Sequence, residues 1–308
     1  MGRMNMGGWL AAGWLWCAAG YAETPPVAAG GSEAGAPLPL RSEEQATPPE
    51  YGGYTLVWHD EFEQDGRPDP KNWTYETGFV RNRELQWYQP ENAWCENGFL
   101  IIEARREVKA NPGYKASSTD WRAQRPAAEY TSAAVTTKGL HNWLYGRFEM
   151  RARIDTRAGL WPAFWTLGVA GHWPDGGEID IMEYYQGNLL ANAAWGSGTA
   201  GQAAWSTVRT PLVELGGAKW SEKFHVWRMD WDEEGVKLYV DGRLLNTVDL
   251  TKTYNRDDPQ INPLRQAQYL LLNLAVGGTS GGDPAATKFP ARYEVDYVRV
   301  YQKTAKAH

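Results

Sequence analysis

The sequence predicts an all-β domain, a sandwich or barrel of about a dozen short antiparallel strands. The clearest strand is residues 147–154, where polar and apolar side chains alternate without interruption. Asn97-Gly98 and Asp241-Gly242 are turn pairs typical of two-residue β-hairpins. No segment has the period of a long helix, and no repeat marks a propeller. Short strands separated by Gly, Pro and Asn favour a β-sandwich.

The predicted strands follow the chain from residue 54 to residue 301. Residues 99–104 and 269–276 are mostly apolar runs, which favours strands buried on both faces. Residues 106–128 are polar and irregular, so we expect a surface loop. The other predicted strands are residues 54–58, 130–137, 147–154, 161–168, 178–184, 190–196, 224–231, 236–240, 243–248 and 293–301.

The chain begins with the features of a secretory signal peptide. One positive charge, Arg3, precedes a mostly apolar run over residues 9–19 that is too short for a membrane span. Gly20-Tyr21-Ala22 places small residues at the two positions that a signal peptidase recognises. We therefore expect cleavage after Ala22, which removes residues 1–22 and leaves a secreted or periplasmic protein.

The sequence contains two cysteines, and only one of them is expected in the mature chain. Cys17 lies in the predicted signal peptide, and the bulky Trp14, Leu15 and Trp16 before it argue against a lipid anchor. Cleavage leaves Cys95 alone, so no intrachain disulfide can form. The core must then be stabilised by packing.

The mature chain divides into a linker and one domain. Residues 23–50 are rich in Pro, Ala, Gly and Glu, which predicts a flexible linker. Residues 51–308 suit one large β-sandwich domain, which we expect to be monomeric and catalytic. The net charge is −6 and there is no basic run, which excludes nucleic acid and anionic membranes as expected partners.

Three acidic residues lie close together in one predicted strand. Glu178 and Asp180 point to one face, whereas strict alternation would place Glu183 with the isoleucines on the other. A β-bulge with Met182 as its extra residue would return Glu183 to the acidic face, and bulges are common beside active sites. We therefore expect Glu178, Asp180 and Glu183 to share one face.

This arrangement indicates glycoside hydrolysis. Retaining glycosidases use two carboxyl groups about 5 Å apart, one as nucleophile and one as acid/base. Crowding raises the pKa of one carboxyl group and keeps its proton available. The alternatives are a metal cluster and a solvated acidic strand. Aromatic residues before and after the acids instead favour a sugar cleft.

The strand and its upstream segment resemble the signature of glycoside hydrolase family 16. Glu178-Ile179-Asp180-Ile181-Met182-Glu183, with Trp161-Pro162-Ala163-Phe164-Trp165 before it, resembles the laminarinase and agarase side of that family. The resemblance implies a jelly-roll sandwich of two curved antiparallel sheets with substrate along the concave face. It also implies that Glu178 is the nucleophile, Glu183 the acid/base and Asp180 the residue between them.

The resemblance further implies residues that bind a polysaccharide. Trp161 resembles the family's sugar-stacking Trp, and Trp165 shares its strand face. Arg81 and Asn82 begin a segment similar to the family's cleft-lining Asn-Glu-Leu-Gln. Trp195 and Trp205 follow the acids, and either could close one end of the cleft.

One departure bears on the substrate. Laminarinases usually carry a His before the aromatic residue that follows the acids, and Ala194 takes that position here, before Trp195. An endo-1,3-β-glucanase acting on laminarin or mixed-linkage glucan is the leading expectation. A galactan hydrolase of the agarase, porphyranase or carrageenase type, and a transglycosylase, remain open.

The resemblance implies no cofactor for catalysis but a structural calcium ion away from the cleft. The matching positions are Glu61, the Gly98 carbonyl and Asp296. Carboxylate and carbonyl oxygens suit Ca²⁺. Solvated acids at these positions are the alternative.

Two interpretations from other functional classes remain. Gly278-Thr279-Ser280-Gly281-Gly282 fits the nucleophile elbow of serine hydrolases, but that elbow needs a helix after it, and none is predicted. A carbohydrate-binding sandwich without activity would explain the aromatic residues but not three acids around a bulge.

Overall fold

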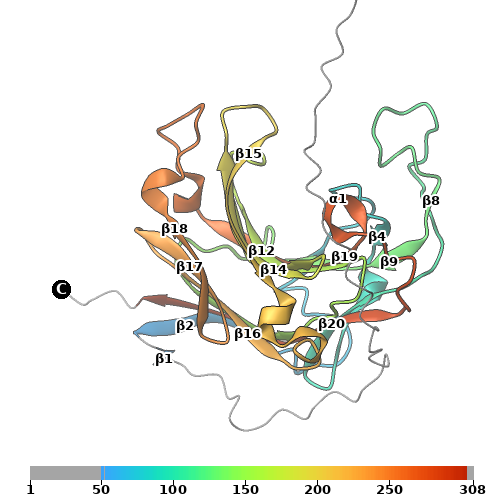
Figure 1. Cartoon of the computed structure of the whole chain (residues 1–308), viewed down its shortest axis with the longest axis horizontal. Helices are drawn as coiled ribbons and strands as arrows, with labels where there is room; N and C mark the ends of the chain where they lie inside the picture. Colours follow the sequence, from blue (N-terminus) through green and yellow to red (C-terminus); the bar gives the residue numbers. More distant parts are fainter. Residues whose placement is uncertain (1–49, 52, 304–308) are drawn as a thin grey trace, which may run out of the picture. The chain divides into compact units, whose positions relative to one another are not determined.

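The computed structural model describes residues 50, 51 and 53–303. The predicted signal peptide and all but the last residue of the predicted linker lie outside them. The described residues form two antiparallel sheets, seen as two layers in Figure 1, with β12, β14 and β19 in one and β16, β17 and β20 in the other. This arrangement confirms the predicted β-sandwich.

The seven-stranded sheet has the order β15-β14-β13-β12-β19-β10-β3. Its central strand β19 is buried along its whole length, as its apolar run predicts. The strands are β3 (Thr74–Tyr75), β10 (Ala134–Thr136), β12 (Leu160–Gly168), β13 (Glu178–Tyr185), β14 (Asn188–Gly196), β15 (Ala203–Pro211) and β19 (Gln268–Val276).

The nine-stranded sheet has the order β1-β2-β20-β11-β16-β17-β18, with β6 paired to β20 and β5 paired to β6. Both predicted hairpin turns are present, because Asn97 and Asp241 have the positive φ that their turns require. The strands are β1 (Glu50–Tyr51), β2 (Tyr54–Asp60), β5 (Ala93–Glu96), β6 (Phe99–Ala104), β11 (Gly146–Arg153), β16 (His225–Trp231), β17 (Gly235–Val240), β18 (Arg243–Asp249) and β20 (Ala291–Lys303).

The core lies between the two sheets. Phe164, Ile179 and Leu272 of the seven-stranded sheet and Met150 and Trp227 of the nine-stranded sheet belong to one buried apolar cluster. The opposite face of the seven-stranded sheet is not part of this core. Cys95 is buried, and burial raises its pKa to about 12.

Short elements connect the strands. They are the pairs β4 (Gln86–Tyr88) with β9 (Tyr130–Ser132) and β7 (Lys109–Ala110) with β8 (Ala127–Ala128), the helix α1 (Gly278–Gly281), and the 3₁₀ turns η2 (Pro90–Asn92), η3 (Leu212–Leu215), η4 (Gly217–Lys219), η5 (Leu250–Lys252) and η6 (Pro263–Arg265). Within the described ranges, no helix has the length and apolar character needed to cross a membrane.

The structure corrects four local expectations. Strand β15 was not predicted, and the predicted strand 130–137 is divided into β9 and β10. The predicted loop 106–128 contains the short strands β7 and β8. The glycine-rich segment after β19 does form a helix, although α1 has only four residues.

Candidate active site

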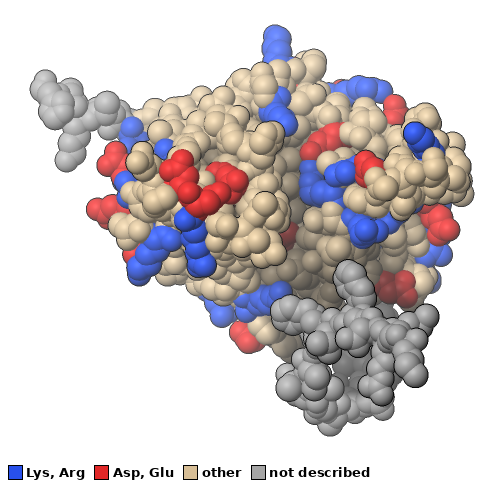
Figure 2. All heavy atoms as spheres, turned by 90° about the horizontal axis from the view of Figure 1, so that it is seen from above, with Lys and Arg blue, Asp and Glu red and all other residues tan. Residues whose placement is uncertain are grey.

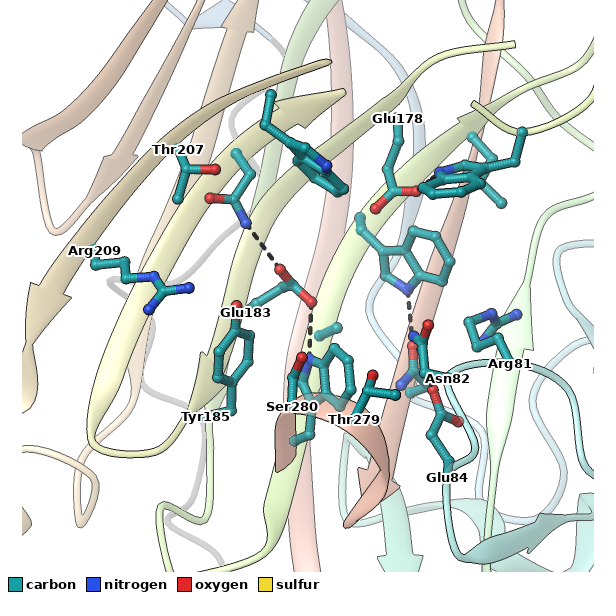
Figure 3. Close-up of a pocket in the computed structure, with 18 of the residues that line it drawn as sticks. Arg81, Asn82, Glu84, Glu178, Glu183, Tyr185, Thr207, Arg209, Thr279 and Ser280 are labelled. Atoms are coloured by element: carbon teal, nitrogen blue, oxygen red, sulfur yellow. Dashed lines mark hydrogen bonds between the residues drawn. The ribbon is translucent and has the colours of Figure 1, made fainter. Parts of the chain in front are cut away.

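A cleft of about 620 Å³ lies on the outer face of the seven-stranded sheet (Figure 3). Its residues come from β12, β13, β14, β15 and β19, from α1, and from loops at one rim. The lining residues are Arg81, Asn82, Glu84, Arg122, Trp161, Ala163, Trp165, Leu167, Trp173, Glu178, Glu183, Tyr185, Asn192, Trp205, Thr207, Arg209, Asn273, Thr279 and Ser280.

A bulge in β13 brings the acids to this face. Asp180 pairs with Asn192 and Glu183 with Leu190, so two residues of β13 oppose one residue of β14. Both intervening side chains, Ile181 and Met182, are buried in the core. The predicted bulge is present, but against β12 the unpaired residue is Ile181 rather than Met182.

Hydrogen bonds connect the acids with the cleft wall. Asn192 donates from Nδ2 to Asp180 Oδ2 at 3.1 Å and to Glu183 Oε2 at 2.9 Å. Trp161 donates from Nε1 to Glu183 Oε1 at 2.8 Å. Trp173 donates from Nε1 to Glu178 Oε2 at 2.7 Å. Each carboxyl group is therefore held by a neutral donor from another element.

Burial raises the pKa of all three acids, and repulsion between the carboxyl groups raises those of Asp180 and Glu183 further. Burial and the Glu178 charge raise the pKa of Glu183 to about 7, against hydrogen bonds from Trp161, Asp180 and Asn192. Burial and both glutamates raise the pKa of Asp180 well above its usual range. Burial also raises the pKa of Glu178, which hydrogen bonds with Asp180 and Trp173 and the Arg81 charge counteract.

This arrangement separates two roles. Glu183 holds its proton up to about neutral pH, which suits a general acid. Glu178 receives an indole N–H and lies near the Arg81 guanidinium, and both favour its ionised form. The buried Asp180 lies between them and exchanges hydrogen bonds with both. The surroundings of the two glutamates therefore suit a paired acid and nucleophile.

Four of the five predicted sugar-binding residues line the cleft. Trp161 and Trp165 share a face of β12, and Trp165 donates from Nε1 to Asn273 Oδ1 at 2.8 Å. Arg81 lies over the Trp165 ring, with its guanidinium carbon 4.9 Å from the ring centroid. Asn82 has a positive φ at the rim loop.

Trp195 does not line the cleft, and the expectation for it was wrong. Neighbouring β14 residues alternate, with Asn192 on the cleft face and Ala193 in the core. Trp195 has the parity of Ala193 and is 9% exposed. Trp205 of β15 lines the cleft instead and is 46% exposed.

Several lining residues were not singled out from the sequence. Thr207 and Arg209 lie on the unpredicted strand β15, and Tyr185 ends β13. Arg122 lies in the loop 106–128 and reaches the rim, where its guanidinium donates to the Val80 carbonyl. The aromatic and β-branched residues Trp205, Thr207 and Val208 were the signal that could have revealed their strand.

Ser280 of the predicted nucleophile-elbow motif lacks the partner residues of a serine hydrolase in the described part of the chain. Ser280 lines the cleft in α1, and its carbonyl accepts a hydrogen bond from Gln186 at 2.8 Å. Across the described residues, no histidine is hydrogen-bonded to the Ser280 hydroxyl. This arrangement lacks the base that a serine nucleophile needs.

The two carboxylates among the predicted calcium ligands form ion pairs with arginines. Both Glu61 oxygens accept from Arg299, at 2.8 and 2.9 Å, and Asp296 Oδ2 accepts from Arg151 at 2.6 Å. Gly98 lies in the β5–β6 turn. In the part of the chain that the structure covers, no three His, Cys, Asp or Glu side chains group to hold a metal. An ion at this site would have to compete with both arginines for the carboxylates, and calcium stays a prediction.

Comparison with known proteins identifies the family. The model of glycosyl hydrolases family 16 matches residues 97–299. A β-glucanase from Rhodothermus marinus is 37% identical over 274 residues, which cover 81% of this chain and 85% of the relative.

Two solved structures extend the comparison. One, from work on endo-acting O-glycanases with which human gut microbiota initiate mucin breakdown, has a TM-score of 0.75 and 36% identity, covering 82% of this chain and 92% of that one. The laminarinase catalytic domain of Thermotoga maritima MSB8 has a TM-score of 0.68 and 33% identity, covering 82% and 99%. Together with the paired acids of the cleft, these matches show that the chain is a glycoside hydrolase and belongs to family 16.

Proposed function

We propose that this protein is an endo-acting, retaining β-glucanase that cleaves β-1,3-glucan or mixed-linkage β-glucan. The observation that carries the proposal is the pairing of Glu178 and Glu183 on one cleft face through Asp180. The similarity to the Rhodothermus β-glucanase and the Thermotoga laminarinase supports the glucan substrate.

The first step forms a glycosyl-enzyme. The Glu178 carboxylate attacks the anomeric carbon, and the glycosidic C–O bond breaks. Glu183 transfers its proton to the leaving oxygen, so the departing chain leaves as a neutral alcohol. The loss of that proton leaves Glu183 ionised beside an esterified Glu178. Burial still raises the pKa of Glu183, but the repulsion from the Glu178 charge is removed.

The second step releases the sugar. Glu183, now ionised, accepts a proton from water while the water oxygen attacks the anomeric carbon. The ester bond to Glu178 breaks, and both carboxyl groups return to their starting states. Two displacements at one carbon retain its configuration.

The aromatic residues supply the sugar-binding surface. Trp161, Trp165 and Trp205 present ring faces or edges to the cleft on both sides of β13. Arg81 and Asn82 add donors at the rim. We therefore assign stacking to the tryptophans and orientation of the sugar to the polar rim.

A galactose-containing glycan is the second candidate substrate. Ala194 pairs with Glu178 in the sheet, at the position where laminarinases usually carry a His. The structure from the work on endo-acting O-glycanases is as similar in sequence as the glucanases. The catalytic steps would be unchanged on such a substrate.

A reducing-end assay tests the proposal. The full chain is incubated with laminarin, mixed-linkage glucan, agarose, porphyran and carrageenan, with Glu178→Gln as the inactive control. We expect laminarin or mixed-linkage glucan to be cleaved internally and the variant to be inactive. Activity only on a galactan would overturn the glucan assignment, and wild-type activity retained in the variant would overturn the mechanism.

Secretion and calcium belong to the same proposal. The N-terminal segment supports export with cleavage after Ala22, which N-terminal sequencing of the exported protein checks. Calcium at Glu61, the Gly98 carbonyl and Asp296 is supported by the family resemblance. Thermal unfolding with and without a chelator tests it, and an unchanged melting temperature would contradict it.

A further inference from the structure

The edge strand β15 presents a row of side chains to one end of the cleft. Trp205, Thr207 and Arg209 occupy alternate positions on the cleft face, and all three are exposed. At about 3.4 Å per residue, the row extends for about 14 Å. It therefore offers contacts to more than one sugar unit beyond the paired acids.

Arg209 differs from the other arginines that line this cleft. Arg81 is paired with Glu76, and Arg122 is held by Asp120 and the Val80 carbonyl. Arg209 has no ion pair to any carboxylate among the residues that the structure describes. Among the described arginines that line the cleft, Arg209 is thus the one whose guanidinium forms no ion pair with a carboxylate.

The neighbours of Arg209 hold it over the cleft. Its guanidinium carbon lies 5.9 Å from the centroid of the Tyr185 ring, and Figure 3 shows it extending toward Tyr185. Arg209 pairs with Leu190, which pairs with Glu183, so these residues lie in one row across the sheet. A group bound to Arg209 therefore lies beside the reaction centre but on a different strand.

The rim of the cleft away from β15 carries further positively charged side chains. Figure 2 shows Lys and Arg atoms gathered beside the hollow. Arg125 stacks on Phe79 and Trp121 at that rim, and its pKa is lowered by burial and by the nearby Arg83. The cleft lining itself contains three arginines and three glutamates, so it is less acidic than the protein as a whole, whose net charge is −6.

We propose that the sugar seated at the β15 end of the cleft carries an oxyanion, a carboxylate or a sulfate ester, which Arg209 binds. Trp205 stacks on the neighbouring ring, and Thr207 donates to or accepts from its hydroxyls. Arginine suits this role because its planar donors match an oxyanion in two parallel hydrogen bonds. The inference rests on the proposed endo-acting function and extends its substrates from neutral glucans to glucans that carry acidic groups.

The size of the effect follows from the exposure of Arg209. An exposed ion pair contributes up to about 1 kcal/mol, which corresponds to about fivefold in affinity. The competing explanation is an arginine that only keeps an edge strand soluble. That explanation predicts no dependence of sugar binding on Arg209.

The test measures binding without turnover. The Glu178→Gln protein is titrated calorimetrically with laminarin, carboxymethyl curdlan and curdlan sulfate at about 0.15 M salt, where charges more than about 8 Å apart are screened. We expect added Arg209→Gln to weaken binding of at least one charged glucan about threefold to fivefold and to leave laminarin binding unchanged. Arg209→Lys should restore part of the affinity.

The matched control is Arg243→Gln, an exposed arginine of β18. Equal affinity for charged glucans with and without the Arg209→Gln substitution would overturn the inference, as would the same loss from Arg243→Gln or the absence of charged-glucan binding. Hydrolysis of neutral laminarin by the wild type tests the proposed function separately. Arg209-dependent binding without hydrolysis of laminarin or of either charged glucan would overturn the proposed glucanase activity alone.

Discussion

Replacing Glu183 by Gln should stabilise the folded protein at alkaline pH. The carboxyl group is buried beside Glu178, and its pKa rises from 4.5 to about 7. The folded state therefore holds this proton more tightly than the unfolded chain. The resulting stabilisation is fully present below the unfolded pKa and is lost as pH rises through about 7. The glutamine of the variant cannot ionise and avoids that loss.

The magnitude follows from the pKa difference. A rise from 4.5 to about 7, at about 1.4 kcal/mol per unit of pKa, gives about 3 kcal/mol. Because Glu178 and Asp180 share protons with Glu183, this value is an upper limit. We expect the variant to gain about 1–3 kcal/mol over the wild type between about pH 5 and about pH 9.

Urea unfolding across this pH range measures the difference. The quantity compared is the free energy of unfolding of Glu183→Gln minus that of the wild type, with the exposed Glu222→Gln as control. The difference in unfolding free energy between Glu183→Gln and the wild type should increase with pH. The same difference for Glu222→Gln should not depend on pH. A difference that is independent of pH, or that falls as pH rises, would refute the electrostatic account of the acids.

The remaining predictions concern activity. Glu178→Gln should reduce turnover at least about a thousandfold with the fold retained, measured by reducing-end release and circular dichroism. Trp161→Phe and Asn192→Ala each remove a hydrogen bond that lowers the pKa of Glu183, so the alkaline limb of kcat/KM should move up by roughly one pH unit. Trp173→Phe removes the indole donor to Glu178 and raises its pKa, so the acidic limb should move up instead. If the limbs of the kcat/KM profile did not move in these variants, the hydrogen bonds would not set the pKa values of Glu178 and Glu183 as described.

One variant controls for the loss of an indole. Trp205 lines the same cleft, and among the described residues its indole nitrogen donates to no carboxylate. Trp205→Phe should therefore leave both limbs in place and affect KM alone. A shifted limb in this variant would show that the profiles report ring packing rather than hydrogen bonding.

The fold was predictable where strands carry their own pattern. Residues 147–154 alternate, and the structure places β11 at Gly146–Arg153. Strand β15 was missed because Ala204 and Ser206, on its other face, are small and only partly buried, so no apolar alternation marks this edge strand. The bulge was predictable because a carboxylate at Glu183 could not enter the core unpaired.

The three acids were predictable from their spacing because they lie within a single strand. Glu178, Asp180 and Glu183 lie on one strand, so spacing and one bulge suffice to bring them together. Asn192 and Arg209 reach the same cleft through the register of β14 and β15. One sequence does not reveal register between strands, and the wrong assignment of Trp195 has the same cause.

Covalent labelling tests the central claim most directly. The wild type is incubated with a 2-deoxy-2-fluoro laminaribiosyl fluoride, digested and analysed by mass spectrometry. We predict a single added disaccharide on the peptide that contains Glu178, with the ester on that side chain. A label on Glu183, or no label on an enzyme that hydrolyses laminarin, would contradict Glu178 as the nucleophile.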